Sequence, residues 1–172
     1  MQKNSEKFGT SDKRGRVSTS LDPFVSDKGL PEPALCKKCR IYYHHKRWVN
    51  DPEMYQQLKL DPEVHWVTCP ACRKIAEGYH EGIVTLRGSY LWKHEDEIRR
   101  LLKNVEIKAF GRNPQERIIR MAQENEQLVV ETTEQRLAEH LGRLLHKAHQ
   151  GELEIHWAKE PDVCRVNWER ML

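Results

Sequence analysis

The sequence predicts an α/β (α+β) protein, in which a small N-terminal module held by cysteines precedes a two-layer α/β domain of about four strands with helices on one face. Four of the five cysteines fall in two closely spaced pairs in the first half of the chain. After residue 82, strand-like alternation and helix-like apolar spacing take turns, as in a two-layer domain. A length of 172 residues suits one ordinary domain plus a small module. We therefore predict a tail over residues 1–30, the cysteine module over 31–81 and the α/β domain over 82–172.

The two cysteine pairs, Cys36 with Cys39 and Cys69 with Cys72, predict a metal site. Two residues between the cysteines of a pair let both sulfurs reach one ion at about 2.3 Å, and two such pairs complete a tetrahedron. A site closed by four thiolates has no open position, so its metal stabilises the fold and takes no part in a reaction. The module is therefore predicted to be a four-cysteine ribbon with these residues as metal ligands.

The identity of the metal is open between zinc and iron. An interval of 29 residues between the pairs and the proline after Cys69 also suit a rubredoxin-like iron site, in which the protein would carry electrons. Tight knuckles favour glycine after the second cysteine, whereas this chain has Arg40 and Arg73 there. Cations beside a dianionic thiolate site suit a ribbon that faces an anion better than a buried electron carrier. We therefore predict Zn²⁺, with Fe as the alternative.

Composition restricts the class of protein. Mean hydropathy is −0.82, and no apolar run is long enough for a membrane span or a signal peptide. Cys164 stands alone, so the cysteine count argues against a disulfide framework and indicates a reducing compartment. The chain has no phosphate loop, nucleophile elbow or His-Glu-x-x-His motif. We expect a cytoplasmic, non-catalytic protein without a membrane or small-molecule partner.

Positive charge is concentrated beside the first cysteine pair. The formal net charge is only +3, yet the segment from Cys36 to Trp48 has five Lys and Arg residues and no acid. Residues 41–48 are β-branched, aromatic and basic, which predicts one exposed strand with Tyr43, His45 and Arg47 on the same face.

Aromatic rings between cations stack on unpaired bases while the cations bind phosphates, as in proteins that bind single-stranded RNA. The alternative for Tyr42 or Trp48 is packing on the metal site. The predicted RNA-binding residues are Lys37, Lys38, Arg40, Tyr43, Lys46, Arg47 and Trp48.

The remainder of the first half has few apolar residues. Residues 1–30 are rich in Ser, Lys, Asp and Gly, so we expect a tail without a core of its own. Its Lys13-Arg14-Gly15-Arg16 cluster either contacts a phosphate backbone or is solvated. Asp51 followed by Pro52 predicts a short helix over residues 52–58. Residues 64–68 then form the predicted strand into the second cysteine pair.

The second half alternates between strand and helix patterns. We predict strands over residues 83–87 and 127–131, a helix over 94–110, a long helix that ends at Gly151, and a final hairpin over 152–168. The predicted core consists of Ile83 or Val84, Ile98, Leu102, Ile119, Val129, Leu141, Leu145, Ile155 and Val166.

A further helix is predicted to begin at Asn113. The motif Asn113-Pro114-Gln115-Glu116 has the cap, proline and acid of a helix start. In that helix Ile118, Ile119 and Ala122 would face the core. The predicted order is therefore strand, two helices, strand, helix and two strands.

Several short motifs occur together in this chain: Leu30-Pro31-Glu32-Pro33, Cys36 to Cys39, Cys69-Pro70-Ala71-Cys72-Arg73-Lys74-Ile75, Gly82-Ile83-Val84-Thr85-Leu86, Asn113-Pro114-Gln115-Glu116-Arg117-Ile118 and Gly151-Glu152-Leu153. With this set, the chain from Pro31 onward resembles bacterial zinc-ribbon proteins related to the N-terminal zinc-binding region of the large-ribosomal-subunit nuclear export adaptor family. The resemblance implies a ribosome-facing protein with the cysteines as zinc ligands. The eukaryotic adaptors have two four-cysteine sites and this chain has one, so no export role is implied. The strand and helix order is also similar to the C-terminal domain of bacterial translation initiation factor three, which binds ribosomal RNA, and this is a likeness of fold alone.

Three classes of function follow from these observations. The first is a zinc-binding, RNA- or ribosome-associated protein that acts in translation or ribosome biology, with the ribosome or ribosomal RNA as partner. The alternatives are a zinc-stabilised protein-interaction module and a rubredoxin-like electron carrier. The sequence leaves open which RNA is bound and whether the chain self-associates.

Overall fold

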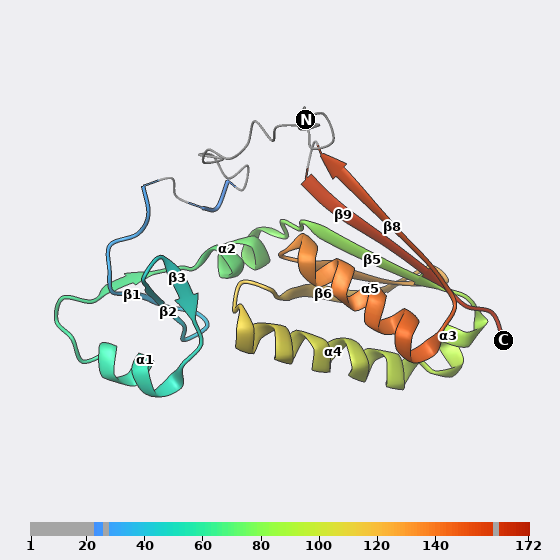
Figure 1. Ribbon diagram of the computed structural model, residues 1–172, viewed down its shortest axis with the longest axis horizontal. Helices are drawn as coiled ribbons and strands as arrows, with labels where there is room; N and C mark the ends of the chain where they lie inside the picture. Colours follow the sequence, from blue (N-terminus) through green and yellow to red (C-terminus); the bar gives the residue numbers. More distant parts are fainter. Residues whose placement is uncertain (1–22, 26–27, 160–161) are drawn as a thin grey trace, which may run out of the picture.

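The structure is a computed structural model that describes residues 23–25, 28–159 and 162–172. Within these residues the chain forms two β-sheets and a set of α-helices, which confirms the predicted α/β class (Figure 1). The predicted tail lies mostly outside the described residues. In its described part, Phe24 is buried and its ring centroid lies 5.0 Å from that of Tyr79, so this position contacts the folded chain. None of the described helices has both the length and the apolar character needed to cross a membrane.

The N-terminal sheet is built from short strands in the order β3-β2-β1-β4. A short helix, α1, connects β3 to β4 and has the predicted bounds. The side chain of Asp51 accepts hydrogen bonds from the N–H groups of Glu53 and Met54, and Pro52 begins the helix, as the sequence predicts. The elements of this module are β1 (Ala34–Cys36), β2 (Tyr42–His44), β3 (Arg47–Val49), α1 (Pro52–Leu58) and β4 (His65–Val67).

The second sheet has five strands in the order β6-β7-β5-β9-β8, where about four were predicted. Neighbouring strands are antiparallel except β5 and β9, which run parallel. Figure 1 shows α4 and α5 side by side over one face of this sheet, which is the predicted two-layer arrangement. The elements are α2 (Pro70–Glu77), β5 (Gly82–Arg87), α3 (Ser89–Lys93), α4 (Glu95–Arg112), β6 (Ile118–Glu124), β7 (Gln127–Thr132), α5 (Gln135–His149), β8 (Glu152–Lys159) and β9 (Asp162–Glu169).

The core of the α/β domain lies between the helices and this face of the sheet. The predicted core residues Val84, Ile98, Leu102, Leu141, Leu145 and Val166 are all buried in one cluster, and Ile155 packs against it. Val129 is buried but points to the opposite face, because Leu128 and Val130 on either side of it face the helices. Ile119 is only partly buried, and its neighbour Ile118 belongs to the cluster instead.

The helix predicted after Asn113 is wrong, because residues 118–124 form β6. The side chain of Asn113 accepts a hydrogen bond from the N–H of Gln115, and its carbonyl accepts from Glu116, so the motif closes a single turn. The chain then enters antiparallel pairing with β7 from Ile118 onward. Tertiary pairing has overridden the local helix-start signal.

Helix α2 connects the two parts of the molecule. Its N–H at Ala71 donates to the side-chain oxygen of Gln115, at 2.9 Å. Lys74 is fully buried, and its ammonium lies 2.9 Å from Glu81 and 3.2 Å from Glu134. The Lys74 ammonium also donates to the carbonyl of Thr133. The helix that begins at the second cysteine pair is therefore fixed to the α/β domain.

Candidate metal centre and basic surface

The first cysteine pair lies in a tight loop at the end of β1. The N–H of Cys36 donates to the carbonyl of Ile41, at 2.9 Å, which closes the loop around the pair. Arg40 follows the second cysteine with φ +58°, the left-handed conformation that glycine usually adopts at this position. A non-glycine residue is thus held in a strained conformation beside the site.

The second cysteine pair differs because it begins a helix. Cys69 is the N-cap of α2 and Pro70 takes its first turn, so Cys72 and Arg73 are helical. Of the two arginines that follow a cysteine pair, Arg40 therefore has a positive φ and Arg73 does not. The two pairs approach each other from a loop and from a helix N-terminus.

The four sulfurs have the spacing of a tetrahedral metal site. All four lie within 4.8 Å of one another, with 3.6 Å between Cys39 and Cys69 and 3.9 Å between Cys36 and Cys72. A tetrahedron with metal–sulfur bonds of about 2.3 Å has edges of about 3.8 Å. Cys36, Cys39, Cys69 and Cys72 are thus placed to hold one metal ion, and their sulfur geometry does not identify the metal.

Backbone groups support the sulfurs. The N–H groups of Lys38 and Cys69 point to the sulfur of Cys36, at 3.4 and 3.3 Å, and the N–H of Cys72 points to the sulfur of Cys69, at 3.4 Å. Such donors stabilise negative charge on a thiolate. Both the loop and the helix therefore favour the ionised form that binds metals.

The close approach of the four thiols changes their pKa values in opposite directions. The hydrogen bond with Cys39 lowers the pKa of Cys36, and the same contact raises the pKa of Cys39. Four thiols this close resist ionising together unless a cation neutralises them. A bound metal would supply that charge, and its binding would release protons.

Apolar side chains enclose the cysteines. Ile41 and Ala71 are buried with them, and Trp48 and Phe110 pack against the cluster from opposite parts of the chain. Trp48 is half-buried here, so the alternative of packing on the metal site applies to this residue. Tyr42 is buried in a separate cluster with Leu35 and Tyr55.

The predicted single strand over residues 41–48 is wrong, because the chain turns at His45 and Lys46. Both have positive φ, and they connect β2 to β3 in a tight hairpin. Their N–H groups donate to the carboxylate of Glu32, each at 3.0 Å. The hydrogen bond from Lys46 lowers the pKa of Glu32. An ionised acid from outside the basic segment therefore lies at the hairpin tip.

The predicted RNA-binding residues are distributed over this loop and hairpin. Tyr43 and Trp48 face each other across the hairpin, with ring centroids 5.3 Å apart. The exposed cations form two groups, one in the cysteine loop and one at the hairpin, and the second lies beside Glu32. The first group is Lys37, Lys38 and Arg40, and the second is Lys46 and Arg47.

A cleft of about 630 Å³ opens beside the metal centre. Its lining includes Lys38, Arg73 and Arg117, together with Cys39 and Cys72, and Glu77 is the one acid of the lining. The guanidinium of Arg117 lies 5.2 Å from the ring centroid of Phe110, and its Nη1 is buried without a partner among the described residues.

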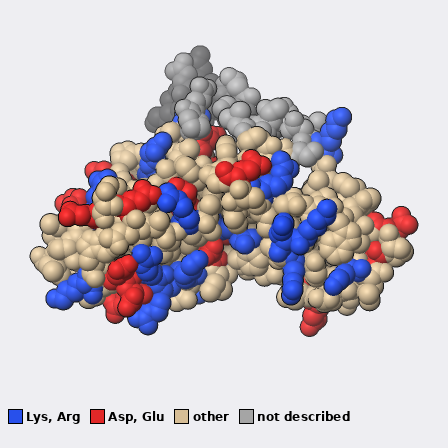
Figure 2. Space-filling view, turned by 180° about the vertical axis from the view of Figure 1, so that it is seen from behind, with Lys and Arg blue, Asp and Glu red and all other residues tan. Residues whose placement is uncertain are grey.

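Arg117 also belongs to this basic surface, although the sequence did not predict it. It lies 45 positions after Cys72, and only the turn at Asn113 brings it to the cleft. The sequence around Arg117 shows only that it precedes the apolar pair Ile118-Ile119. Figure 2 shows the resulting charge distribution on the face seen from behind: Lys and Arg gather on the inner part of the N-terminal module, at the right of the view, with acids at its outer edge, whereas acids and bases alternate over the α/β domain.

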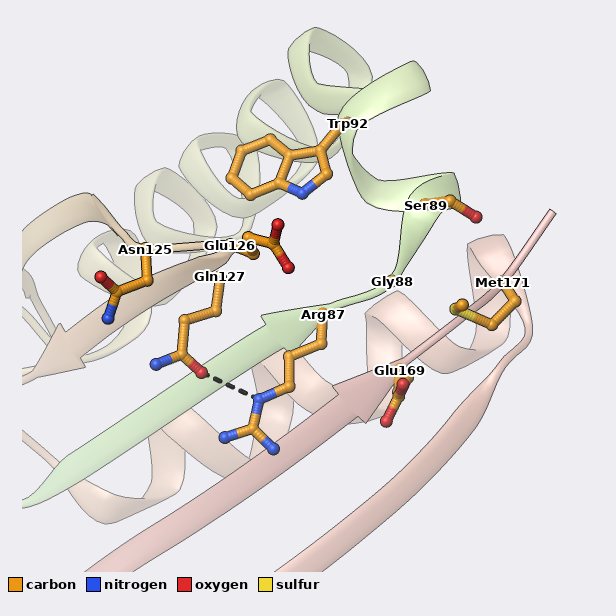
Figure 3. A pocket seen from close by; sticks show the side chains of 9 residues that line it. All are labelled: Arg87, Gly88, Ser89, Trp92, Asn125, Glu126, Gln127, Glu169 and Met171. Carbon is orange, nitrogen blue, oxygen red and sulfur yellow. Dashed lines mark hydrogen bonds between the residues drawn. The ribbon is translucent and has the colours of Figure 1, made fainter.

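A second cleft, of about 780 Å³, lies at the far end of the large sheet (Figure 3). Arg87 donates to the side-chain oxygen of Gln127, at 2.8 Å, while Glu126, Glu169 and the indole of Trp92 complete the rim. The residues that line it include no cysteine or histidine and no nucleophile paired with a base. We assign no chemistry to this cleft.

Comparison with known proteins adds no family assignment: no protein-family model, no curated protein and no solved structure matches this chain.

Proposed function

We propose that the protein binds one zinc ion through Cys36, Cys39, Cys69 and Cys72, and that the metal-held module binds RNA, with the ribosome as the site of action. The observation that carries the proposal is the position of exposed cations around a rigid cysteine centre. This proposal agrees with the resemblance to ribosome-facing zinc-ribbon proteins described above.

Zinc is preferred to iron because a site beside an open, cation-lined cleft suits a ribbon that faces an anion better than a buried electron carrier. A four-thiolate Zn²⁺ site has a net charge of −2, and Lys38, Arg73 and Arg117 line the cleft next to it. These cations offset the thiolate charge and leave a surface that attracts a further anion. Iron remains the alternative, and metal analysis with an absorption spectrum distinguishes the two because a four-thiolate ferric site is coloured and zinc is not.

RNA fits this surface better than a small anion does. Lys37, Lys38 and Arg40 lie in a loop whose backbone is fixed by one hydrogen bond to the sulfur of Cys36 and by backbone hydrogen bonds, so binding orders few new dihedral angles. The cations extend from this loop into the cleft, which suits a chain of phosphates. Tyr43, half-buried against Trp48, is the ring that we propose to stack on an unpaired base.

The test is RNA binding by metal-loaded protein over a series of salt concentrations. Log K should fall by about 0.7 per phosphate contacted on a single strand. The variant Lys37→Glu, Lys38→Glu, Arg40→Glu should bind more weakly and with a smaller salt slope. A matched control is Lys93→Glu, Arg100→Glu, Lys108→Glu, which makes the same change of charge at exposed positions of α3 and α4.

Stacking is tested separately. Tyr43→Ala should cost about 1–3 kcal/mol of binding free energy that persists at high salt. Co-sedimentation with ribosomal subunits tests the proposed partner. If both triple variants bind RNA equally well with zinc retained, the basic loop is not the binding surface.

If the basic loop is not the binding surface, we propose the protein-interaction module instead. One observation favours this alternative. A small apolar cleft of about 220 Å³ lies between the hairpin and α1, lined by Pro33, Tyr42, Met54 and Leu58 among others. Trp66 on β4 is also 43% exposed. These side chains would then mark the binding surface for a protein.

A further inference from the structure

Strand β8 is an unpartnered edge of the large sheet. It is eight residues long and pairs with β9 along its whole length, and no described element lies along its other side (Figure 1). An exposed edge of this length presents a row of free N–H and C=O groups, which natural proteins usually cover or pair. Such an edge is a template for pairing with a further strand.

The outward backbone groups of β8 can be identified from the pairing of β9. Cys164 and Arg170 donate their N–H groups to the carbonyls of Glu81 and Arg87, so the even-numbered residues of β9 point toward β5. Its odd-numbered residues therefore point toward β8, where Arg165 pairs with His156 and Asn167 with Glu154. The groups of β8 that point outward are those of Leu153, Ile155 and Trp157.

We propose that β8 pairs with β8 of a second copy of this chain, antiparallel and centred on Ile155, to form a symmetric dimer with one continuous sheet. The two-fold axis places Ile155 opposite Ile155 of the second copy, and Leu153 opposite Trp157. These are the residues whose backbone groups point outward, so this register satisfies them in reciprocal hydrogen-bonded pairs. The interface is of the kind that two-fold symmetry produces, in which the same patch meets itself.

Side chains on both faces of β8 fit this register. On the helix side, Trp157 is 52% exposed although Leu153 and Ile155 on the same strand face pack on the core. In the dimer its indole lies beside Leu153 of the second copy, which is an aromatic–aliphatic cross-strand pair. The large exposed ring thus acquires a contact surface that the described part of one chain does not provide.

On the open face the register pairs opposite chemistry. Glu154 lies opposite His156 of the second copy, and by symmetry His156 lies opposite Glu154. These are non-hydrogen-bonded positions, where side chains approach most closely. Within one chain the two side chains already contact each other at 3.5 Å, and Arg165 neighbours His156 on β9. Each carboxylate would therefore be flanked by donors from both copies.

The first test is the mass of the metal-loaded protein in solution as a function of concentration. We expect a reversible dimer, and a monomer at every concentration up to about 1 mM, where even an association free energy of only a few kcal/mol is visible, would overturn the proposal. Ile155→Pro removes an outward N–H and should abolish the dimer. Edge strands tolerate proline where the N–H faces solvent, so metal content and helix signal should be retained.

A charge exchange tests the register. Glu154→Lys places a lysine opposite His156, and His156→Glu places a glutamate opposite Glu154, so each should weaken the dimer by about 2- to 30-fold over its two symmetric pairs. The double variant places a lysine opposite a glutamate across the axis and should recover most of the affinity. If all three variants dimerise equally, the strands do not pair in this register.

Crosslinking provides an independent test of the axis. With Ile155→Cys the two introduced thiols lie on adjacent strands within disulfide range, so mild oxidation should give a covalent dimer. Leu153→Cys is the matched control, because its own copy lies about 14 Å away along the strand direction. Equal crosslinking of both variants would indicate random collision and contradict the proposed axis.

Discussion

The two parts of the molecule are stabilised in different ways. The α/β domain has one continuous cluster of buried apolar side chains between its helices and its sheet. The N-terminal module has two small clusters, one around the cysteines and one between β1 and α1. Strands of three residues cannot bury enough apolar surface to offset the entropy of ordering them, and a metal ion held by the four cysteines would supply the difference.

Metal removal should therefore have the largest effect, and it should be confined to the module. The apparent free energy of binding at structural zinc sites is about 10–16 kcal/mol at neutral pH, and most of it is folding free energy. We expect chelation, or Cys69→Ser, to abolish the folded-state amide NMR signals of residues 31–67. The folded-state signals of β5 to β9 should persist. Cys69 is the preferred position for the substitution because it is both a proposed metal ligand and the N-cap of α2.

The outcome that would contradict this contrast is the loss of all amide signals at once. That outcome would show that the two parts unfold as one cooperative unit, because α2 is fixed to the α/β domain. Acid should have the same effect as chelation, since the thiolates compete with protons for the metal. Metal content measured against falling pH checks this.

The second effect concerns the buried Lys74 between the two parts. Lys74→Met leaves Glu81 and Glu134 without the ammonium that lies within 3.2 Å of both, and breaking a buried ion pair typically costs about 3–5 kcal/mol. Urea unfolding of the metal-loaded variant measures the loss. Lys93→Met, at an exposed position of α3, is the control and should change the free energy of unfolding by less than about 0.5 kcal/mol.

The third effect is confined to the α/β core. Leu141→Ala should cost about 2–5 kcal/mol, because Leu141 is fully buried in the main cluster. Val130→Ala should cost more than Val129→Ala, since only Val130 faces the helices. These variants should keep their metal. Equal losses at the two valines would mean that Val129, which is buried on the other face of the sheet, is packed as tightly as Val130.

The smallest effect concerns the reactivity of the buried Cys164 thiol. Burial raises the pKa of the Cys164 thiol to about 11, so its thiolate is present in only about one molecule in a thousand at pH 8. We expect chelated protein to react rapidly with a thiol reagent at four of its five cysteines, while Cys164 reacts slowly. The rate at Cys164 should rise as the pH approaches its pKa. Rapid reaction of all five would show that metal loss also opens the α/β core.

Local chemistry allowed the sequence to predict much of the fold. Four sulfurs around one ion require closely spaced cysteines, so the cluster was predictable from spacing alone. The cap and proline at Asp51 and Pro52 gave the bounds of α1 as observed. Amphipathic spacing similarly predicted that Ile98, Leu102 and Leu141 would be buried together.

The errors occurred where distant contacts decide the conformation. The Asn113-Pro114 motif can begin a helix or close a turn, and pairing with β7 selects the turn. The hairpin at His45 and Lys46 lacks the glycine or asparagine that marks such turns, and the carboxylate of Glu32 stabilises it instead. No local pattern around Cys39 indicates that Arg117 lies beside it.

The attachment of α2 has a consequence for the order in which the chain folds during synthesis. The second cysteine pair begins a helix whose supporting contacts come from Gln115, 44 residues after Ala71, and from Glu134, 60 residues after Lys74. At translation rates of about 5–20 residues per second, the ligands therefore emerge several seconds before these partners. A nascent chain that captures its metal early must do so with the helix held only by nearby contacts such as that of Lys74 with Glu81, and the contacts with Gln115 and Glu134 form later with the α/β domain.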